Sequence, residues 1–436
     1  MMTLSQKFMI FFFFLALYSV STLSSYTASW LPVIALFGFS ALFSLLTILR
    51  KNQAKVNVLV LLWYGVILIC AIGCFRTSFF RDLIFYSISG IVLTGSVWVD
   101  ERTSYDCLKI MLAASFLFLV GIGIQLFSPA FFDRMIFPLF RAASRDDVIR
   151  QYYYHKMYSG FSSETSVCAQ FLMLGLVCFY CTGGHKKSNW KAVIIVIILL
   201  IGIILTGKRS SLFFFAASFI YMLLVSVPRS KKGKRVLSIL LGITVFLIIA
   251  VIAFPKIAAV STSRNTIVRI VESFSEDEDF SNGRFTIWGN AWAAFLEHPV
   301  TGNGWSWYLI NYGYGAHNTY LQLLCECGIF GGSFILCAIA YFFLLCHRNM
   351  KAALMSKSPY RIAVAKFCIF SQTYFLLYCI TGNPLYNYSF FLWYILSICL
   401  INAGLSSREE TAISDGSVYS EISDIKDTSE INAVIH

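Results

Sequence analysis

The feature that most constrains the fold of this chain is a series of apolar runs, each long enough to cross a lipid bilayer. A spanning helix needs about 20 mainly apolar residues to cross a hydrocarbon core about 30 Å thick. Hydrophobic residues occupy 58% of the 436 positions and charged residues only 13%, which is too much apolar surface for a water-soluble core. The runs lie at residues 8–23, 30–49, 56–74, 83–99, 108–127, 161–181, 191–206, 210–227, 236–254, 318–346, 363–380 and 388–404. They predict an all-α polytopic membrane protein with about twelve transmembrane helices, because lipid offers no partner to the backbone of open strands.

The positive charges predict the orientation of these helices. The net charge is +12, and most lysines and arginines fall in inner segments if the N-terminus is cytoplasmic and the helices alternate. The short outer loops then hold only Arg76, Arg81, Lys208 and Arg209. This positive-inside pattern predicts a multi-pass membrane protein with both termini in the cytoplasm. The basicity is thereby explained without a nucleic-acid partner.

Two long outer loops and a polar tail complete the predicted organisation. The membrane domain covers residues 1–405 and includes extracytoplasmic loops at 128–160 and 255–317, which are predicted to be ordered and functional. Residues 406–436 are acidic and are predicted to form a disordered cytoplasmic tail. The thirteen cysteines show neither metal-ligand spacing nor a disulfide framework, so no metal site and no cofactor is expected.

The second long loop is predicted to contain two helices. The first carries Arg264 and Arg269 around an apolar stripe, and the second runs from Arg284 to about Glu297 and is ended by Pro299. The loop is therefore predicted to be helical and extracytoplasmic.

A histidine ends this loop, immediately before the apolar run at 318–346. A neutral imidazole at His317 can accept a proton from an acceptor hydroxyl near neutral pH. The alternative is an interfacial histidine that caps the helix or bonds a loop carbonyl. Its neighbour Asn318 can orient a substrate or cap the helix.

Three basic residues in two segments are candidates for binding phosphate. Arg284 opens a predicted helix with Trp288 on the same face, and a guanidinium at a helix N-terminus suits a phosphate. The alternative is stacking on Trp288 or pairing with the acidic run before it. Lys208 and Arg209 occupy a very short outer turn, where they can hold a lipid diphosphate or simply reach lipid headgroups.

Other polar residues support this hypothesis less directly. Glu164 and Glu326 lie within or at the ends of apolar runs, where a carboxylate is costly unless it is paired or protonated, so pairing with an arginine of the site is expected for both. In the first long loop, Arg145, Arg150 and Tyr154 can bind phosphates and stack on sugars. The tyrosines of this loop can equally belong to an interfacial aromatic belt.

These features together resemble the O-antigen ligase/polymerase superfamily of bacterial envelope enzymes. His317-Asn318 followed by Gly328-Ile329-Phe330-Gly331 resembles its His-Asn…Gly-x-x-Gly signature. Residues 283–305 resemble its Arg-x-x-x-Trp…His-Pro-x-x-Gly-x-Gly block, and TGKRSS at 206–211 resembles its small-residue and arginine turn. Lys208 departs from the pattern, which often has a small hydroxyl residue before the arginine.

The resemblance implies a metal-independent glycosyltransferase of GT-C-like architecture that faces the periplasm or cell exterior. Its donor would be a glycan on undecaprenyl diphosphate, held in the lipid bilayer, and its partners would include a flippase and a chain-length regulator. By motif, Arg284 and Arg209 would bind the departing diphosphate and His317 would activate or orient the acceptor hydroxyl. Preorganised cations that meet the growing charge make a metal unnecessary.

Three functions are compatible with these motifs. The first hypothesis is a polymerase that joins repeat units of O-antigen or capsular polysaccharide. The second is a ligase that transfers finished glycan to a lipid or protein acceptor. A flippase or transporter is the third, but it would place ionisable residues along a central pathway, whereas here they gather in the outer loops.

Overall fold

In the computed structural model, the described residues are 3–52, 56–184, 190–227 and 283–414, and their regular secondary structure is entirely helical. The helices of the first half are α1 (Leu4–Thr22), η1 (Leu23–Ser25), α2 (Leu31–Lys51), α3 (Val58–Thr77), α4 (Arg81–Ser96), α5 (Glu101–Phe127), α6 (Pro129–Phe131), η2 (Phe132–Ile136), η3 (Phe137–Leu139), α7 (Ala142–Val148), η4 (Ile149–Tyr154) and α8 (Thr165–Cys181). The remaining helices are α9 (Trp190–Leu205), α10 (Arg209–Val225), α13 (Arg284–Glu297), α14 (Trp307–Tyr312), α15 (Thr319–Ser356), α16 (Pro359–Tyr378) and α17 (Tyr388–Ser414).

The apolar runs form helices, as predicted. Each run coincides with a helix except 236–254, which lies outside the described residues. Among the described helices, six are long and apolar enough to cross a membrane, and three shorter apolar helices accompany them. Leu61, Leu68 and Ile72 on α3 leave 58–62% of their surface exposed, and an apolar exterior of this kind requires lipid as its solvent. The chain is therefore a membrane protein; the count of twelve spans and the GT-C-like arrangement stay predictions.

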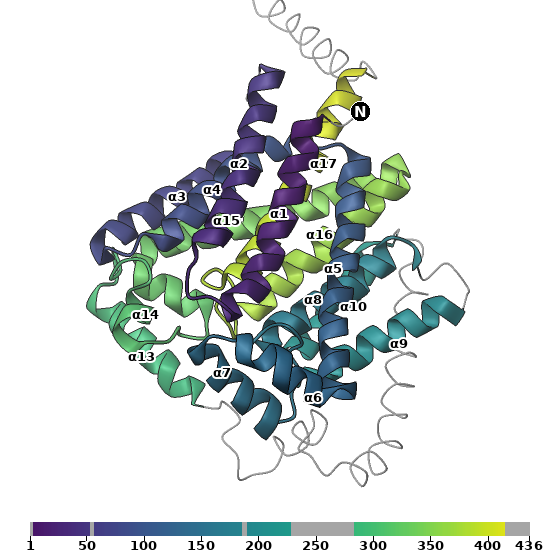
Figure 1. The fold of residues 1–436 in the computed structure, drawn as a ribbon. Helices are drawn as coiled ribbons and strands as arrows, with labels where there is room; N and C mark the ends of the chain where they lie inside the picture. The colour runs from purple at the N-terminus through teal and green to yellow at the C-terminus, as the bar shows by residue number, and fades with distance from the viewer. Residues whose placement is uncertain (1–2, 53–55, 185–189, 228–282, 415–436) are drawn as a thin grey trace, which may run out of the picture.

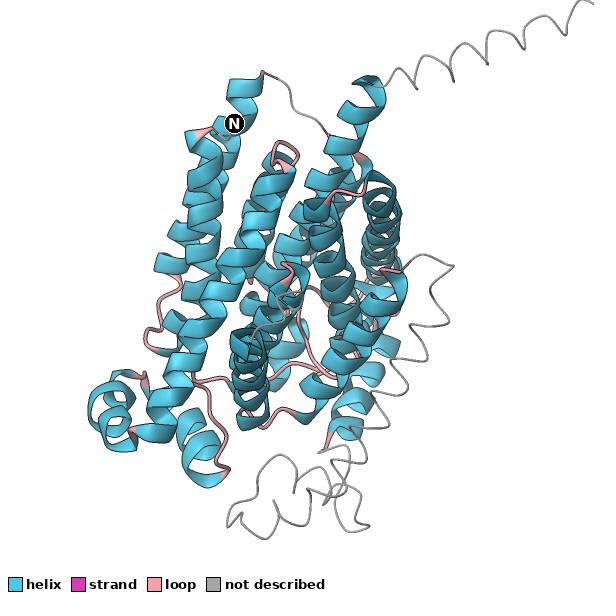
Figure 2. Cartoon of the chain, turned by 90° about the vertical axis from the view of Figure 1, so that its right-hand side faces the viewer, coloured by secondary structure: helices cyan, strands magenta, loops and turns pink. Residues whose placement is uncertain are grey.

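The long helices form one bundle with two different ends (Figure 1). The start of α1 and the end of α17 lie at one end, while α6, α7, α13 and α14 cover the other, which we call the loop end. Figure 2 shows the same arrangement from the side. The first and last described helices thus have these two ends on the same side of the bundle; the orientation of that side stays a prediction.

Helices α16 and α17 occupy the interior of the bundle. Helix α16 packs against α5, α8, α10, α15 and α17. In the membrane-length part of α17, Tyr388–Leu405, 89% of the residues are buried. Five helices that begin at the loop end or return to it therefore surround α16, and this packing brings distant parts of the sequence together there.

The first long loop folds into short helical turns against the bundle. Phe132, Phe140, Val148 and Tyr152 form its small core. Gln125 at the end of α5 fixes the return of the chain, since its Oε1 accepts hydrogen bonds from the backbone N–H groups of Ser159 at 3.1 Å and Gly160 at 2.8 Å.

The C-terminal region differs from the prediction at its start. Helix α17 continues to Ser414, beyond residue 405 where the membrane domain was predicted to end; the predicted disorder of the tail stays a prediction. Residues 415–436 lie outside the described residues.

Candidate active site at the loop end of the bundle

Helix α13 presents Arg284 at its first position. The predicted bounds are confirmed: the helix runs from Arg284 to Glu297, after Gly283 in a left-handed conformation (φ +77°). Ile287, Ala291, Ala294 and Phe295 pack this helix against α14 and α15. No hydrogen bond or ion pair of the Arg284 guanidinium is seen within the described ranges. Trp288 keeps its Nε1 buried without a partner.

The backbone on both sides of His317 is fixed by hydrogen bonds. The preceding amide, at Ala316, donates to Gln322 Oε1 at 2.9 Å. Asn318 caps α15, its Oδ1 accepting from the Leu321 amide at 3.1 Å, and Thr319 donates to the Cys379 carbonyl at 2.9 Å. His317 itself lies in the left-handed region (φ +51°), which costs an L-residue about 1 kcal/mol or more. The fold therefore holds this residue in a strained position.

Two predicted cations lie close to the imidazole of His317. Protein packed around the ring lowers the pKa of His317 below its ordinary value, and the positive charges of Arg284 and Lys208 lower it further. The side chain nonetheless remains exposed to solvent. A lowered pKa keeps the imidazole neutral at neutral pH, which is the form that can accept a proton. His317, Arg284 and Lys208 are thus brought together from three separate segments.

The turn that carries Lys208 is held against the first long loop. Gly207 adopts φ +73°, and a Cβ at this position would lie 2.5 Å from the Met157 side chain. The Tyr158 amide donates to the Leu205 carbonyl at 2.9 Å. Arg209 follows as the first residue of α10, but its side chain lies outside what the structure describes, so its assignment as a catalytic residue stays a prediction.

Glu164 borders the same site at the N-terminus of α8. Its Oε2 accepts from Asn387 Nδ2 at 3.3 Å. The surrounding protein raises the pKa of Glu164, while the bond from Asn387 and the charges of Lys208 and Arg141 oppose this rise. The hydrogen-bond partner of Glu164 is thus the Asn387 amide, and its pairing with an arginine stays a prediction; Arg141 is a nearby cation that the sequence hypothesis did not select.

The other predicted residues of the first long loop have local partners. Arg145 donates to the carbonyl of Phe140 at 2.7 Å and to that of Pro138 at 2.5 Å. Arg150 pairs with Asp147 at 2.8 Å on the surface, and Tyr154 is 77% exposed. The structure therefore shows Arg145 as a support of the loop fold. The two predicted residues of the second loop, Arg264 and Arg269, lie outside the described residues.

The helical conformation of α15 is interrupted at Gly328, and the turn after α13 supplies hydrogen-bond partners to the backbone groups around the interruption. Gly328 has φ +66° and ψ −173°, a region open essentially to glycine alone. The freed carbonyls of Cys325 and Glu326 accept from the amides of Asn303 at 3.0 Å and Gly304 at 2.8 Å. The Ile329 amide donates to the Pro299 carbonyl at 2.8 Å. The glycines of the two motifs are thus parts of one contact between the second loop and α15.

Two buried carboxylates hold the segment between this contact and His317. Glu326 accepts from the amides of Ser306 at 2.8 Å and Tyr308 at 3.2 Å, from Gln322 Nε2 at 3.0 Å and from the Tyr386 hydroxyl at 2.7 Å. The expected arginine partner of Glu326 is therefore wrong: these partners are backbone amides and uncharged side chains, because the loop folds over the carboxylate.

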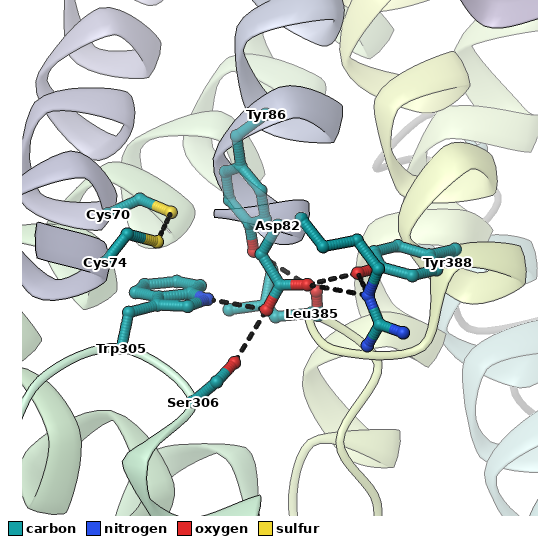
Figure 3. Close-up of polar contacts among 9 residues, drawn as sticks. Cys70, Cys74, Asp82, Tyr86, Trp305, Ser306, Leu385 and Tyr388 are labelled. Carbon is teal, nitrogen blue, oxygen red and sulfur yellow. Dashed lines mark hydrogen bonds and ion pairs between the residues drawn. The ribbon is translucent and has the colours of Figure 1, made fainter. Parts of the chain in front are cut away.

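The second carboxylate, Asp82, was not among the candidate residues selected from the sequence. Figure 3 shows it between Trp305, Ser306 and Tyr388. Asp82 Oδ2 accepts from Trp305 Nε1 at 2.9 Å and from Ser306 Oγ at 2.7 Å, and Oδ1 accepts from the Tyr388 hydroxyl. Asp82 is 3% exposed. Asp82 could have been selected from the sequence, because it is a carboxylate in the first turn of an apolar helix and a buried carboxylate needs hydrogen-bond or charged partners.

Comparison with known proteins finds one family match. The family model of O-antigen ligase matches residues 194–336, about a third of the chain. This region is similar to the O-antigen ligase family, which supports the resemblance to the O-antigen ligase/polymerase superfamily. The matched region contains Lys208, Arg284, His317 and the contact at Gly328. No curated protein gives a significant match to the chain.

The arrangement contains groups with the chemistry that glycosyl transfer needs. His317 lies within the electrostatic influence of Arg284 and Lys208, and Trp288 has a buried N–H group on the same helix as Arg284. Cations held in advance near a leaving diphosphate stabilise its developing charge without the cost of reorganisation.

Proposed function

We propose that this protein is an extracytoplasmic glycan polymerase that joins oligosaccharide repeat units carried on undecaprenyl diphosphate, building O-antigen or capsular polysaccharide. The observation that carries the proposal is the proximity of His317 to Arg284 and Lys208. A base beside cations suits the transfer of a sugar from an anionic leaving group to a hydroxyl.

In the proposed reaction, the acceptor hydroxyl oxygen forms a bond to the anomeric carbon of the donor. The bond between that carbon and the diphosphate oxygen breaks, and its electron pair leaves with the lipid diphosphate. His317 accepts the hydroxyl proton, while Arg284 and Lys208, together with Arg209, which follows Lys208 in the sequence, neutralise the charge of the leaving group. The charge balance requires no metal ion, so we expect activity to survive chelation by EDTA.

The proposed orientation places the loop end outside the cytoplasmic membrane and both termini inside. This agrees with the positive-inside pattern and lets the diphosphate of a lipid-anchored donor reach the site at the membrane surface. A flippase that delivers the donor and a chain-length regulator are the proposed partners. Labelling a cysteine placed at position 280 with a membrane-impermeant reagent tests the orientation; reaction only from the cytoplasmic side contradicts it.

The central experiment replaces His317 with alanine in the full chain, reconstituted with a lipid-diphosphate-linked oligosaccharide. We expect the variant to insert normally and to bind the donor, but to lose chain elongation by about 100-fold or more, the usual contribution of a general base. His347→Ala is the control, because His347 lies near the opposite end of α15 and bonds Tyr221. Unchanged glycan lengths with His317→Ala would remove the base from the mechanism.

A ligase is the second candidate, because the matching family model is described as O-antigen ligase. The two functions differ in what accumulates when the gene is deleted. Single repeat units attached to the final acceptor indicate a polymerase, whereas long lipid-linked chains without the acceptor indicate a ligase.

A further inference from the structure

Ser306 lies where carboxylates from two different helices meet. Its backbone N–H donates to Glu326 of α15 at 2.8 Å, and its Oγ donates to Asp82 of α4 at 2.7 Å. The residue is fully buried and has φ +60°, a conformation that needs support from its surroundings in an L-residue. Ser306 is therefore fixed by two long-range bonds rather than by local preference.

The same two carboxylates fix the residues on both sides of Ser306. Asp82 binds the indole N–H of Trp305, and Glu326 binds the amide of Tyr308 at 3.2 Å. Both carboxylates also reach the segment before α17, where Tyr386 donates to Glu326 and Tyr388 donates to Asp82. The loop that leads to His317 is thus attached to α4, α15 and the start of α17 at once.

A short chain of bonds connects Glu326 to His317 itself. Gln322 donates from Nε2 to Glu326 Oε1 at 3.0 Å, which fixes the orientation of its amide. Its Oε1 is then turned to accept from the Ala316 amide at 2.9 Å, one residue before His317. A change in the bonding at Glu326 is therefore transmitted through Gln322 to the backbone that holds the strained His317.

We propose that Asp82 and Glu326 are positioning residues of the transfer reaction, holding the loop through Ser306 and Ala316 so that His317 stays beside Arg284 and Lys208. This inference rests on the proposed role of His317 as the base. Neither carboxylate needs to touch the substrate. Each carboxylate has two oxygens that can accept hydrogen bonds, and the neighbours described above place donors at both.

Amide substitutions test this proposal because they keep the shape of each side chain and replace one accepting oxygen with an NH₂ donor. In Glu326→Gln or Asp82→Asn, an NH₂ group faces donors that previously found an oxygen, so at least one loop bond is lost. Glu297→Gln is the matched control, since it removes a carboxylate from the exposed end of α13. Full-length proteins in lipid nanodiscs are compared by nuclear magnetic resonance titration of His317 and by kinetics.

The titration reports the position of His317 independently of turnover. Arg284 on α13 and Lys208 before α10 are the charged groups that lower its pKa, so displacement of the ring raises the pKa toward its ordinary value. We expect this rise, a matching shift of the acid limb of kcat to higher pH, and a fall in kcat of about 100-fold, the cost of misplacing a reacting group by about 1 Å. The KM for the donor should stay within about threefold, because Arg284 and Lys208 are retained.

The result that overturns the proposal is an unchanged His317 pKa together with an unchanged kcat in both amide variants. If the amide variants do not fold and insert, Tyr386→Phe and Ser306→Ala take their place, since each deletes one hydrogen bond. Each should raise the His317 pKa by a smaller amount. An unchanged His317 pKa in both variants would also overturn the proposal. If the wild-type protein transfers no glycan, the proposed function fails, and the titration still decides whether the two carboxylates position His317.

Discussion

Replacing Gly328 with alanine should open the contact between the second loop and α15. The added Cβ would lie 2.3 Å from the Val300 carbonyl oxygen, a distance that forces the backbone to move. Alanine at φ +66° and ψ −173° costs about 1–3 kcal/mol in strain. Moving the chain also weakens the bonds from Asn303, Gly304 and Ile329, each worth about 1 kcal/mol. Together these effects give a local destabilisation of about 3–5 kcal/mol.

Hydrogen exchange measures this local opening at the amides concerned. A loss of about 3 kcal/mol raises the exchange rate of Asn303 and Gly304 more than 100-fold if exchange follows local opening. Gly123→Ala provides the control, because Gly123 is inside α5 and a Cβ there meets nothing within 4 Å; it should be neutral or stabilising by about 0.5–1 kcal/mol. Equal protection of Asn303 and Gly304 in wild type and Gly328→Ala would refute the account of the helix break.

Three further changes follow from the described contacts. Arg284→Gln removes a positive charge that lowers the His317 pKa, so this pKa should rise and the acid limb of the pH–rate profile should shift to higher pH. The affinity for the donor should also fall. An unchanged profile together with an unchanged affinity would contradict the position of Arg284 near His317. Arg145→Gln removes two hydrogen bonds to carbonyls and should destabilise the first loop by about 1–3 kcal/mol. Arg150→Gln removes an exposed ion pair and should change stability by less than about 1 kcal/mol. Limited proteolysis should cleave the loop faster in the first variant than in the second, and equal cleavage rates would contradict this distinction. Asn318→Ala deletes the cap of α15 and should cost about 1 kcal/mol, visible as faster exchange of the Leu321 amide, while Asn52→Ala beyond α2 should leave that amide unchanged.

Patterns that lie within one segment were readable from the sequence. The bounds of α13 followed from its apolar spacing and from Pro299, and the described membrane helices followed from run length. Asn318 was recognised as a possible cap, and the structure shows that it is one. These features depend on neighbours a few residues away, so local periodicity and capping rules suffice to predict them.

Features made by distant residues were only partly accessible. Glu326 was expected to pair with an arginine but accepts from loop amides instead. The identity of a buried carboxylate's partner depends on which segment folds over it, and spacing along the chain does not contain that information.

Sequence patterns are enough to identify this protein as a helical membrane protein and to select side chains with the chemistry for transfer. Run length and composition identify the membrane helices, because a spanning helix must match the thickness of the bilayer and satisfy its own backbone hydrogen bonds; residue type selects the side chains. The folded structure was needed to place His317 near Arg284 and Lys208, and to show that Asp82 and Glu326 hold the loop through Ser306. The reason is physical: packing around α16 and the broken helix at Gly328 bring together groups whose charges and hydrogen bonds act only over a few ångströms.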